Sequence, residues 1–211
     1  MAAVILVHGF LRRGSNMRYL ARKLKQQGYS VLAPDLPATF RSVRECGESL
    51  CEIIGKNIPE GGVVHFVGHS MGGLIIRDCL SRRVIGGLGR VVLIGTPNGG
   101  SPYANLLSGV PFSRRFFESL PDLAEPGPDI APPLNVPAPE IGIIIGTRPD
   151  FIRKHLLRGV HDGLVTASSV RRVAASGEMT VPCSHERIHW RDDTAKAVAL
   201  FLETGKFSDA Q

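Results

Sequence analysis

The chain has 211 residues, of which 43% are hydrophobic and 21% are charged. This length suits one α/β domain with a full core, and the composition excludes an intrinsically disordered chain. The formal net charge is +6, but the basic residues are scattered along the sequence, so we expect solvated basic faces and no nucleic-acid partner.

Strand-like and helix-like segments alternate along the chain. This alternation predicts a single α/β domain over residues 1–211, with a parallel sheet covered by helices on both faces. Strands are expected near residues 3–7, 29–33, 62–68, 90–95, 140–146 and 178–183. Helices are expected near residues 16–27, 41–57, 71–85, 101–108, 112–120 and 192–204, the first with an N-cap at Ser15 and a stop at Gly28.

The first predicted strand runs into the loop His8-Gly9-Phe10. We expect His8 to brace this loop by hydrogen bonding, because buried polar groups need partners. Enzymes with a serine on a strand-to-helix turn take one donor of their oxyanion hole from such a loop. The donor here would be the Phe10 N–H, with that of Leu11 as the alternative.

The third predicted strand ends in a Gly-x-Ser-x-Gly element, with Ser70 between Gly68 and Gly72. An apolar β-branched run precedes it and a helix-like run follows, which is the context of a nucleophile elbow. The two glycines allow strand and helix to approach closely. The Met71 N–H would be the other oxyanion donor. The simpler alternative is a glycine-rich turn that happens to carry a serine.

A serine is a weak nucleophile at neutral pH and needs a base, which in turn needs an orienting acid. In elbow enzymes the acid precedes the base along the chain. Asp162, in a loop after the fifth predicted strand, is our candidate for the acid. Asp150 competes, but it could cap a helix over residues 151–157. Asp192 and Asp193 fit the first turn of the last helix.

His185 follows the last predicted strand by two residues and is our candidate for the base. His189 competes with it but lies nearer the last helix, and the adjacent Trp190 suggests packing. We expect His69, which precedes the serine, to be a packed elbow residue. His65, on the third strand, is expected to lie in or beside the core.

These motifs together resemble the α/β-hydrolase superfamily and, within it, small lipases and carboxylesterases. The resemblance is carried by residues 7–10, 68–73, 93–101, 162–165 and 184–185. It implies ester hydrolysis through an acyl-enzyme, with Ser70 as nucleophile, Asp162 as acid and His185 as base. It also implies a six-stranded, mainly parallel sheet in the order 2-1-3-4-5-6. The two strands that usually precede the His-Gly strand are missing, as in minimal lipases, so a sheet edge would be covered or used in association.

Residues 109–139 interrupt the strand-helix alternation, because proline fixes φ and lacks a backbone donor. Seven prolines fall between residues 121 and 139, at positions 121, 126, 128, 132, 133, 137 and 139. We expect an extended excursion that either borders the pocket or is a plain surface connection. It is too short for a large helical cap, which predicts an open, shallow site for small or medium acyl esters.

The acyl group of the substrate would lie near the triad. Apolar residues close to the triad in the sequence are therefore candidates for the wall of the acyl pocket. This reasoning selects Phe10, Leu11, Leu74, Val165 and Ile188. An acyltransferase or thioesterase would use the same triad, and a non-enzymatic binding module on the same scaffold is a further alternative. The expected partner is a small-molecule ester, with transient contact to a lipid interface.

Other classes of site have no support in the sequence. It contains no P-loop, no G-x-G-x-x-G and no HExxH helix, so we expect no metal and no cofactor. The four cysteines lack C-x-x-C spacing and are expected to be free thiols. No apolar run approaches the ~20 residues of a membrane span. The chain begins with a strand rather than a leader, so we expect a cytoplasmic protein.

Overall fold

The computed structural model describes residues 2–58, 61–110 and 116–208. Within these residues, six strands form one sheet in the order β2-β1-β3-β4-β5-β6, and every neighbouring pair is parallel. The expected strand order is therefore confirmed. The strands are β1 (Ala3–Val7), β2 (Ser30–Leu32), β3 (Val64–His69), β4 (Leu88–Ile94), β5 (Ile141–Gly146) and β6 (Gly177–Val181).

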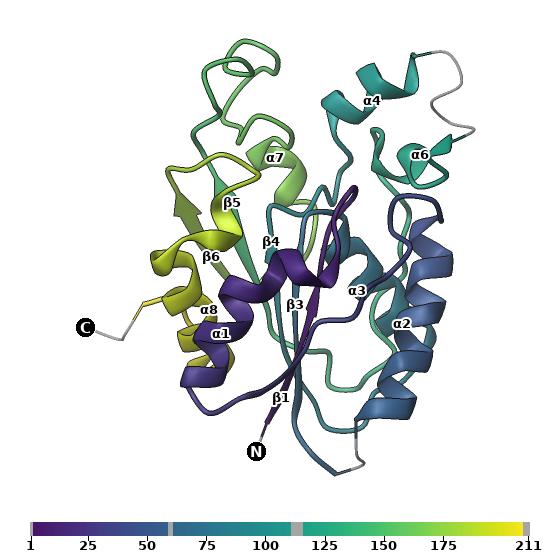
Figure 1. The fold of residues 1–211 in the computed structure, drawn as a ribbon, viewed down its shortest axis with the longest axis vertical. Coiled ribbons are helices and arrows are strands. Elements are labelled where there is room, and N and C mark those ends of the chain that lie inside the picture. The colour runs from purple at the N-terminus through teal and green to yellow at the C-terminus, as the bar shows by residue number, and fades with distance from the viewer. Residues whose placement is uncertain (1, 59–60, 111–115, 209–211) are drawn as a thin grey trace.

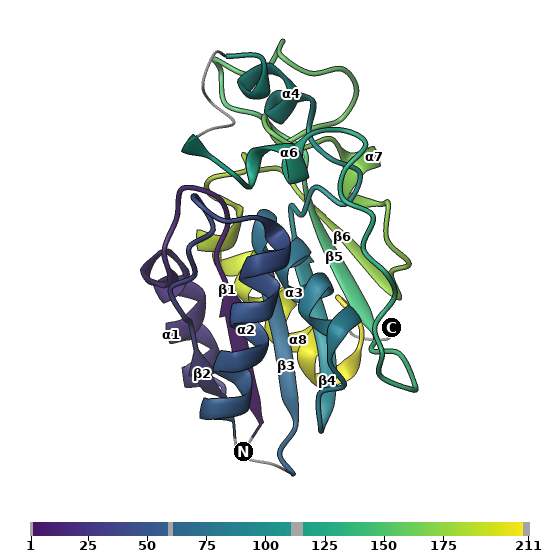
Figure 2. The same ribbon diagram turned by 90° about the vertical axis from the view of Figure 1, so that its right-hand side faces the viewer.

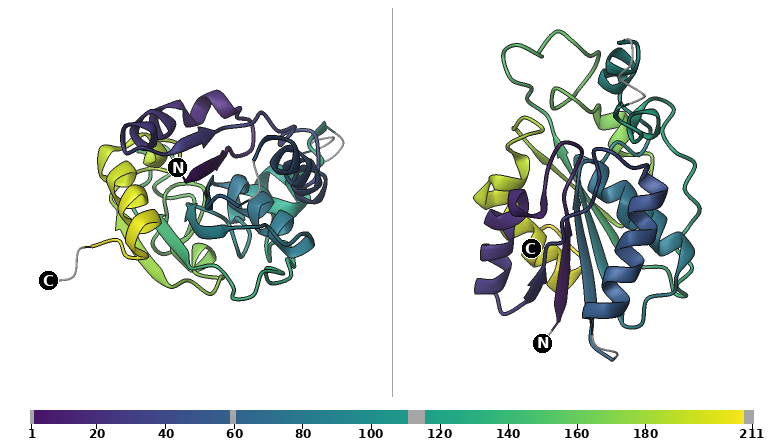
Figure 3. Two further views of the ribbon diagram at one scale, coloured as in Figure 1. Left: turned by 90° about the horizontal axis from the view of Figure 1, so that it is seen from below. Right: turned by 45° about the vertical axis from the view of Figure 1, so that its right-hand side comes forward.

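Helices cover both faces of the sheet (Figures 1 and 3). One face carries α1 (Arg18–Gln26) and α8 (Asp192–Thr204), and the other carries α2 (Val43–Asn57) and α3 (Met71–Arg82). Side chains alternate along β1, so Ile5 faces the core under α2 and α3 while Leu6 faces the core under α1 and α8. Both faces are thus apolar, as expected for a parallel sheet buried on both sides.

The carboxyl ends of the strands all point to one end of the molecule, where the shorter elements gather (Figure 2). These are α4 (Pro102–Ser108), α6 (Leu120–Leu123) and α7 (Ala167–Val170). The 3₁₀ turns η1 (Gly14–Met17) and η2 (Ile188–Trp190) precede α1 and α8. The Pro-rich excursion contributes α6 to this end before it returns to β5. No helix among the described residues is both long enough and apolar enough to span a bilayer.

Local sequence signals explain where several helices begin and end. The Ser42 hydroxyl accepts from the Glu45 N–H at 3.2 Å and the Glu45 carboxylate accepts from the Ser42 N–H at 3.0 Å, which caps α2. The expected bounds of the last helix are confirmed, with Gly205 adopting φ 78° after it. Gly28, with φ 87°, follows α1 as expected.

Three expected helix features are wrong or lie outside the description. The first helix begins as a 3₁₀ turn, in which Asn16 rather than Ser15 caps by accepting from the Arg13 N–H at 2.8 Å. Residues 151–157 form turns, because their apolar side chains are exposed and no core stabilises a helix there. Of the helix expected at 112–120, residues 112–115 lie outside the described residues, and α6 begins only at Leu120.

The expectation of four free thiols is also wrong. Cys51 of α2 forms a disulfide with Cys79 of α3, whereas Cys46 and Cys183 are free and buried. The two bonded residues are 28 positions apart and have no motif spacing. They meet only because α2 and α3 pack side by side, which the sequence pattern does not specify.

Candidate active site

Ser70 lies on the tight turn between β3 and α3, in the elbow geometry that its flanking residues predict. Its φ and ψ are 57° and −130°, a conformation that non-glycine residues rarely adopt and that marks stored strain. A Cβ on Gly68 would lie 2.5 Å from the Gly73 nitrogen, and one on Gly72 would collide with the Val7 carbonyl oxygen. Only glycine at these two positions lets strand and helix meet closely enough to hold the serine.

Three side chains from three loops meet at this turn. His185 Nε2 lies 2.9 Å from Ser70 Oγ, and His185 Nδ1 lies 2.6 Å from Asp162 Oδ2. A carboxylate oxygen only accepts, so Nδ1 carries the proton and the Nε2 lone pair faces the serine hydroxyl. His185 and Asp162 are both buried, while Ser70 is half-buried. This arrangement can remove the proton from Ser70 and hold the resulting imidazolium against a buried carboxylate.

The loops around Asp162 fix its carboxylate. Oδ1 accepts from the backbone N–H groups of Leu164 and Val165 at 3.0 and 2.8 Å, which leaves Oδ2 for His185. The His185 N–H in turn donates to the Asp162 carbonyl at 3.0 Å. Backbone and side-chain hydrogen bonds therefore hold the loops of Asp162 and His185 in a fixed position relative to each other.

The competing carboxylates lie elsewhere and are engaged by cations. Asp150 accepts from Arg153 at 3.0 Å. Asp192 binds Lys23 and Lys196, and these hydrogen bonds lower its pKa to about 2. Asp193 accepts from Arg191 at 2.6 Å. The structure brings none of the three to Ser70.

The competing histidine packs behind the site rather than in it. The rings of His189 and His69 lie 4.0 Å apart, and burial, with the nearby His185, lowers the pKa of His189 to about 3. His69 is itself buried, and its Nε2–H donates to the His185 carbonyl oxygen at 3.0 Å. This bond ties the elbow directly to the loop that carries His185. Trp190 is half-exposed and donates from Nε1 to the Asn16 carbonyl.

The loop after β1 lies against the elbow, where a second oxyanion donor is needed. A Cβ on Gly9 would lie 2.8 Å from the Ser70 Cβ, so the two backbones are in close contact. The Leu11 N–H donates to Thr39 Oγ1 at 3.1 Å, which occupies it and favours Phe10 over Leu11 as donor. Met71 is the first residue of α3, where backbone N–H groups have no partner within the helix.

His8 braces this loop, as its position predicted. Its Nδ1–H donates to the Gly9 carbonyl and its Nε2 accepts from the Leu36 N–H, both at 3.0 Å. Burial lowers the pKa of His8, which keeps the ring neutral and able to make both bonds.

A cavity of about 390 Å³ opens beside Ser70 and has a largely apolar wall. Of the predicted wall residues, Phe10, Leu11 and Val165 line it. Leu74 and Ile188 do not: both are completely buried in the cores beneath the helices, so their prediction is wrong. Closeness in sequence to the triad did not place them at the cavity, because their side chains point into the protein.

Residues that the sequence did not single out complete the wall. Tyr103, Ala104 and Leu107 come from α4, and Leu120 and Leu123 from α6 within the Pro-rich excursion. The sequence contained one signal that α4 lies near the site, because α4 follows the carboxyl end of β4. Nothing in the periodicity of the Pro-rich excursion distinguished its pocket residues.

Charged side chains lie along the rim of the cavity. Glu186, next to His185, accepts from Arg153 at 3.4 Å and lies 3.9 Å from Arg12. Arg153 also lies over the Tyr103 ring, 5.8 Å from its centroid. Among the described residues, His, Cys, Asp and Glu side chains nowhere gather in the threes that could hold a metal ion.

Comparisons with known proteins agree with this architecture. A search of curated protein sequences finds no match. The lipase BlEst2 of Bacillus licheniformis, in its mature form, is 19% identical, with a TM-score of 0.73 over 95% of this chain and 90% of that chain. The metagenomic carboxyl esterase MGS0156 is 15% identical, with a TM-score of 0.70 over 87% of this chain and 64% of that chain.

A third similar structure is a pyrethroid hydrolase from Sphingobium faniae JZ-2, 18% identical, with a TM-score of 0.61 over 97% of this chain and 98% of that chain. At such identities these similarities establish the fold. The family model described as "Alpha/beta hydrolase family" matches residues 4–205, which is nearly the whole sequence. The chain therefore belongs to the alpha/beta hydrolase family.

Proposed function

We propose that the chain is a serine carboxylic ester hydrolase that acts through an acyl-enzyme. The observation that carries this proposal is the continuous hydrogen-bonded path from Ser70 to His185 to Asp162, with distances of 2.9 and 2.6 Å. A serine in a strained elbow, a buried imidazole and a buried carboxylate in this order are the parts of a nucleophile, a general base and an orienting acid.

In the first half of the reaction, Ser70 Oγ attacks the ester carbonyl carbon while His185 Nε2 accepts the hydroxyl proton. The imidazolium then donates this proton to the leaving alkoxide, which departs as an alcohol and leaves an acyl-serine. In the second half, a water molecule gives its proton to Nε2 and attacks the acyl carbon. The proton returns to Ser70 Oγ as the carboxylic acid departs, and Asp162 stabilises the imidazolium in both halves.

The negative oxygen of each tetrahedral intermediate needs donors that are already in place. We assign these to the Met71 N–H, at the start of α3, and the Phe10 N–H, in the loop braced by His8. The positive end of the α3 dipole adds to this stabilisation. A single such donor typically lowers the activation barrier by about 3 kcal/mol.

The cavity supports short to medium acyl chains as substrates. Its volume is about 390 Å³, and its wall is largely apolar, with five leucines among the lining residues. A series of p-nitrophenyl esters of increasing acyl length should show its highest kcat/KM at short to medium chains. A strong preference for long-chain emulsions would contradict the assignment of this cavity to the acyl group.

Labelling with a fluorophosphonate probe tests the nucleophile directly. The parent should be labelled at Ser70, and S70A should lose both labelling and ester hydrolysis, the latter by about 10⁴-fold or more. The control is S15A, which removes an exposed hydroxyl in η1 and should behave as the parent. Labelling of S70A at the parental rate would refute the assignment.

The acyl acceptor is decided by the same assay with added alcohol. If water is the acceptor, free acid accumulates at the rate at which p-nitrophenol is released. An acyltransferase using the same three residues would instead convert most of the acyl groups into a new ester. A thioesterase would be recognised by faster turnover of the matched thioester.

A further inference from the structure

The connection between β5 and α7 projects an apolar tip into solvent. We define the tip loop as residues 147–160. Phe151 and Ile152 are 83% and 89% exposed, and Leu156 and Val160 are also exposed. Isolated exposed apolar side chains are common on soluble proteins, but a concentration of large ones within ten residues marks an interaction site.

Positive charge accompanies these apolar side chains. The tip loop has four Lys and Arg residues and a single acidic residue, Asp150, which gives it a net charge of +3. Asp150 is bound by Arg153, so Arg148, Lys154 and Arg158 are left exposed without compensation from the loop itself. The Lys154 ammonium lies 4.7 Å from the Phe151 ring centroid, which places cation and apolar surface side by side.

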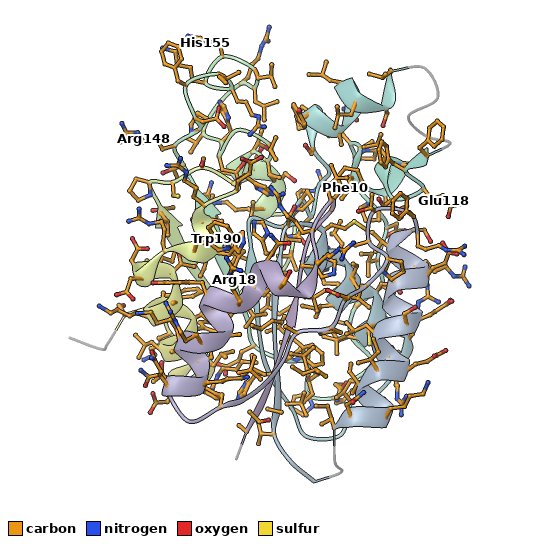
Figure 4. The ribbon with its side chains drawn as sticks, viewed as in Figure 1. Phe10, Arg18, Glu118, Arg148, His155 and Trp190 are labelled. Atoms are coloured by element: carbon orange, nitrogen blue, oxygen red, sulfur yellow. A yellow bond between two sulfur atoms is a disulfide. The ribbon has the colours of Figure 1, made fainter. Side chains whose placement is uncertain are left out.

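The tip loop lies at the same end of the molecule as the opening of the cavity. Figures 1 and 2 show it beside α4 beyond the carboxyl ends of the strands, and Figure 4 shows His155 at its outer end and Arg148 nearer its base. Its Arg153 lines the cavity, as do Tyr103 and Leu107 of α4. Leu106, the neighbour of Leu107 on α4, is exposed to solvent.

We propose that this end of the molecule docks on the surface of an anionic phospholipid bilayer. Phe151 and Ile152 enter the boundary between headgroups and acyl chains, while Lys154 and Arg158 meet the lipid phosphates. Apolar side chains on a projecting loop, flanked by cations, match the two requirements of interfacial binding. A second copy of the chain fits poorly, because two loops of like charge would then face each other.

The expected strength follows from the separate contributions. Each Lys or Arg near an anionic bilayer contributes about fivefold to affinity. K154Q/R158Q should therefore weaken binding to anionic vesicles by about 30-fold. Removing the two most exposed apolar side chains of the tip loop, in F151S/I152S, should weaken it by at least about tenfold.

Vesicle co-sedimentation tests these values without any catalysis. The full chain, carrying S70A, is mixed with vesicles of phosphatidylcholine alone or of equimolar phosphatidylcholine and phosphatidylglycerol. We expect binding to the anionic vesicles, weaker binding to the neutral ones, and loss of binding as salt is raised. The orientation of the bound cavity rests on the proposed function, but the binding itself does not, so either proposal can fail alone.

Matched controls come from the opposite end of the molecule. Val84 and Val136 are exposed apolar residues beside Ile85, which precedes β4 and donates its N–H to Asn135 at 3.1 Å. Lys25 and Lys56 lie in the last turns of α1 and α2. V84S/V136S and K25Q/K56Q should bind anionic vesicles as the parent does.

Three results would overturn the proposal. One is equal binding of the parent to neutral and anionic vesicles, and another is an equal loss of binding in the tip-loop and control variants. The third is dimerisation of the parent, seen by analytical ultracentrifugation, that F151S/I152S abolishes while vesicle binding is absent. Thermal unfolding of the same variants reports whether they are folded, independently of any ester hydrolysis.

Discussion

Replacing Asp162 with asparagine should leave the fold intact and remove most of the ester hydrolysis. Asparagine has the same shape, but one of its two terminal groups donates instead of accepting. In the parent, one carboxylate oxygen accepts from the N–H groups of Leu164 and Val165, and the other accepts from His185. In D162N, the amide oxygen can serve only one of these two sides.

The backbone donors decide which way the amide turns. If its oxygen faced His185, the NH₂ group would face the buried N–H of Val165 and the part-buried N–H of Leu164, each left unpaired at a cost of about 1–3 kcal/mol. The oxygen therefore stays with Leu164 and Val165, and the NH₂ group faces His185 Nδ1. Nδ1 must then accept, the ring proton moves to Nε2, and Nε2 no longer accepts the proton of Ser70.

The same arithmetic gives the size of the effect. A preference of about 2–6 kcal/mol for the inactive arrangement corresponds to a loss of about 30-fold to 10⁴-fold in kcat. Turnover of p-nitrophenyl acetate at saturation measures this loss, and thermal unfolding should show that D162N remains folded. Fluorophosphonate labelling should slow in parallel, because it requires the same proton transfer.

The controls are Asp150 and Asp192, two of the three other aspartates that we considered for this role from the sequence. D150N removes the surface ion pair with Arg153, and D192N removes those with Lys23 and Lys196. Exposed pairs contribute about 0–1 kcal/mol, so both variants should stay within a few-fold of the parental rate. A D162N protein with full activity, or a D192N protein with the larger loss, would refute the assignment of the acid.

Two further predictions concern folding. G72A should fail to fold or unfold at a much lower temperature, since its Cβ would collide with the Val7 carbonyl, whereas G62A meets no atom within 4 Å and should match the parent in thermal unfolding. The pKa of His189 is lowered to about 3 from the unfolded value of about 6.5, so the unfolded chain binds the extra proton between these values. The free energy of unfolding should therefore decrease as pH falls below about 6.5, by up to about 1.4 kcal/mol per pH unit from this group. The free energy of unfolding, measured in urea at about pH 7 and about pH 5, should depend less steeply on pH in H189Q than in the parent. An equal pH dependence in both proteins would contradict the assignment to His189.

The fold was predictable because its main signals are local. Each buried strand is a short β-branched run, and each long helix has an apolar stripe with recognisable ends, as at Ser42 and Gly205. The strand order came from the family resemblance. The loop at 151–157 was misjudged because a capping residue and apolar side chains were present, whereas a core for the helix to pack against was not.

The proximity of Ser70, Asp162 and His185 could also be predicted from the sequence, because the carboxyl ends of parallel strands lie at one edge of the sheet. The residues of the cavity wall were harder to predict from the sequence. Leu74 lies one turn beyond Ser70 on α3, and its side chain turns into the core. Leu120 lines the cavity from a Pro-rich stretch with no periodic pattern. Such contacts depend on how loops fold over the sheet edge, which pattern alone does not determine.

The tip loop and the candidate acid share one connection, yet the two proposals predict separable effects. Arg153 bonds to Glu186 at 3.4 Å, and Glu186 directly follows His185, so an ion pair holds the tip loop against the rim of the cavity. Phe151 has no such tie and is exposed, while Asp162 is buried and held by backbone donors. Changes at Phe151 should therefore alter the concentration of lipid surface needed for half-maximal rate, whereas changes at Asp162 should lower the rate at saturation on every substrate.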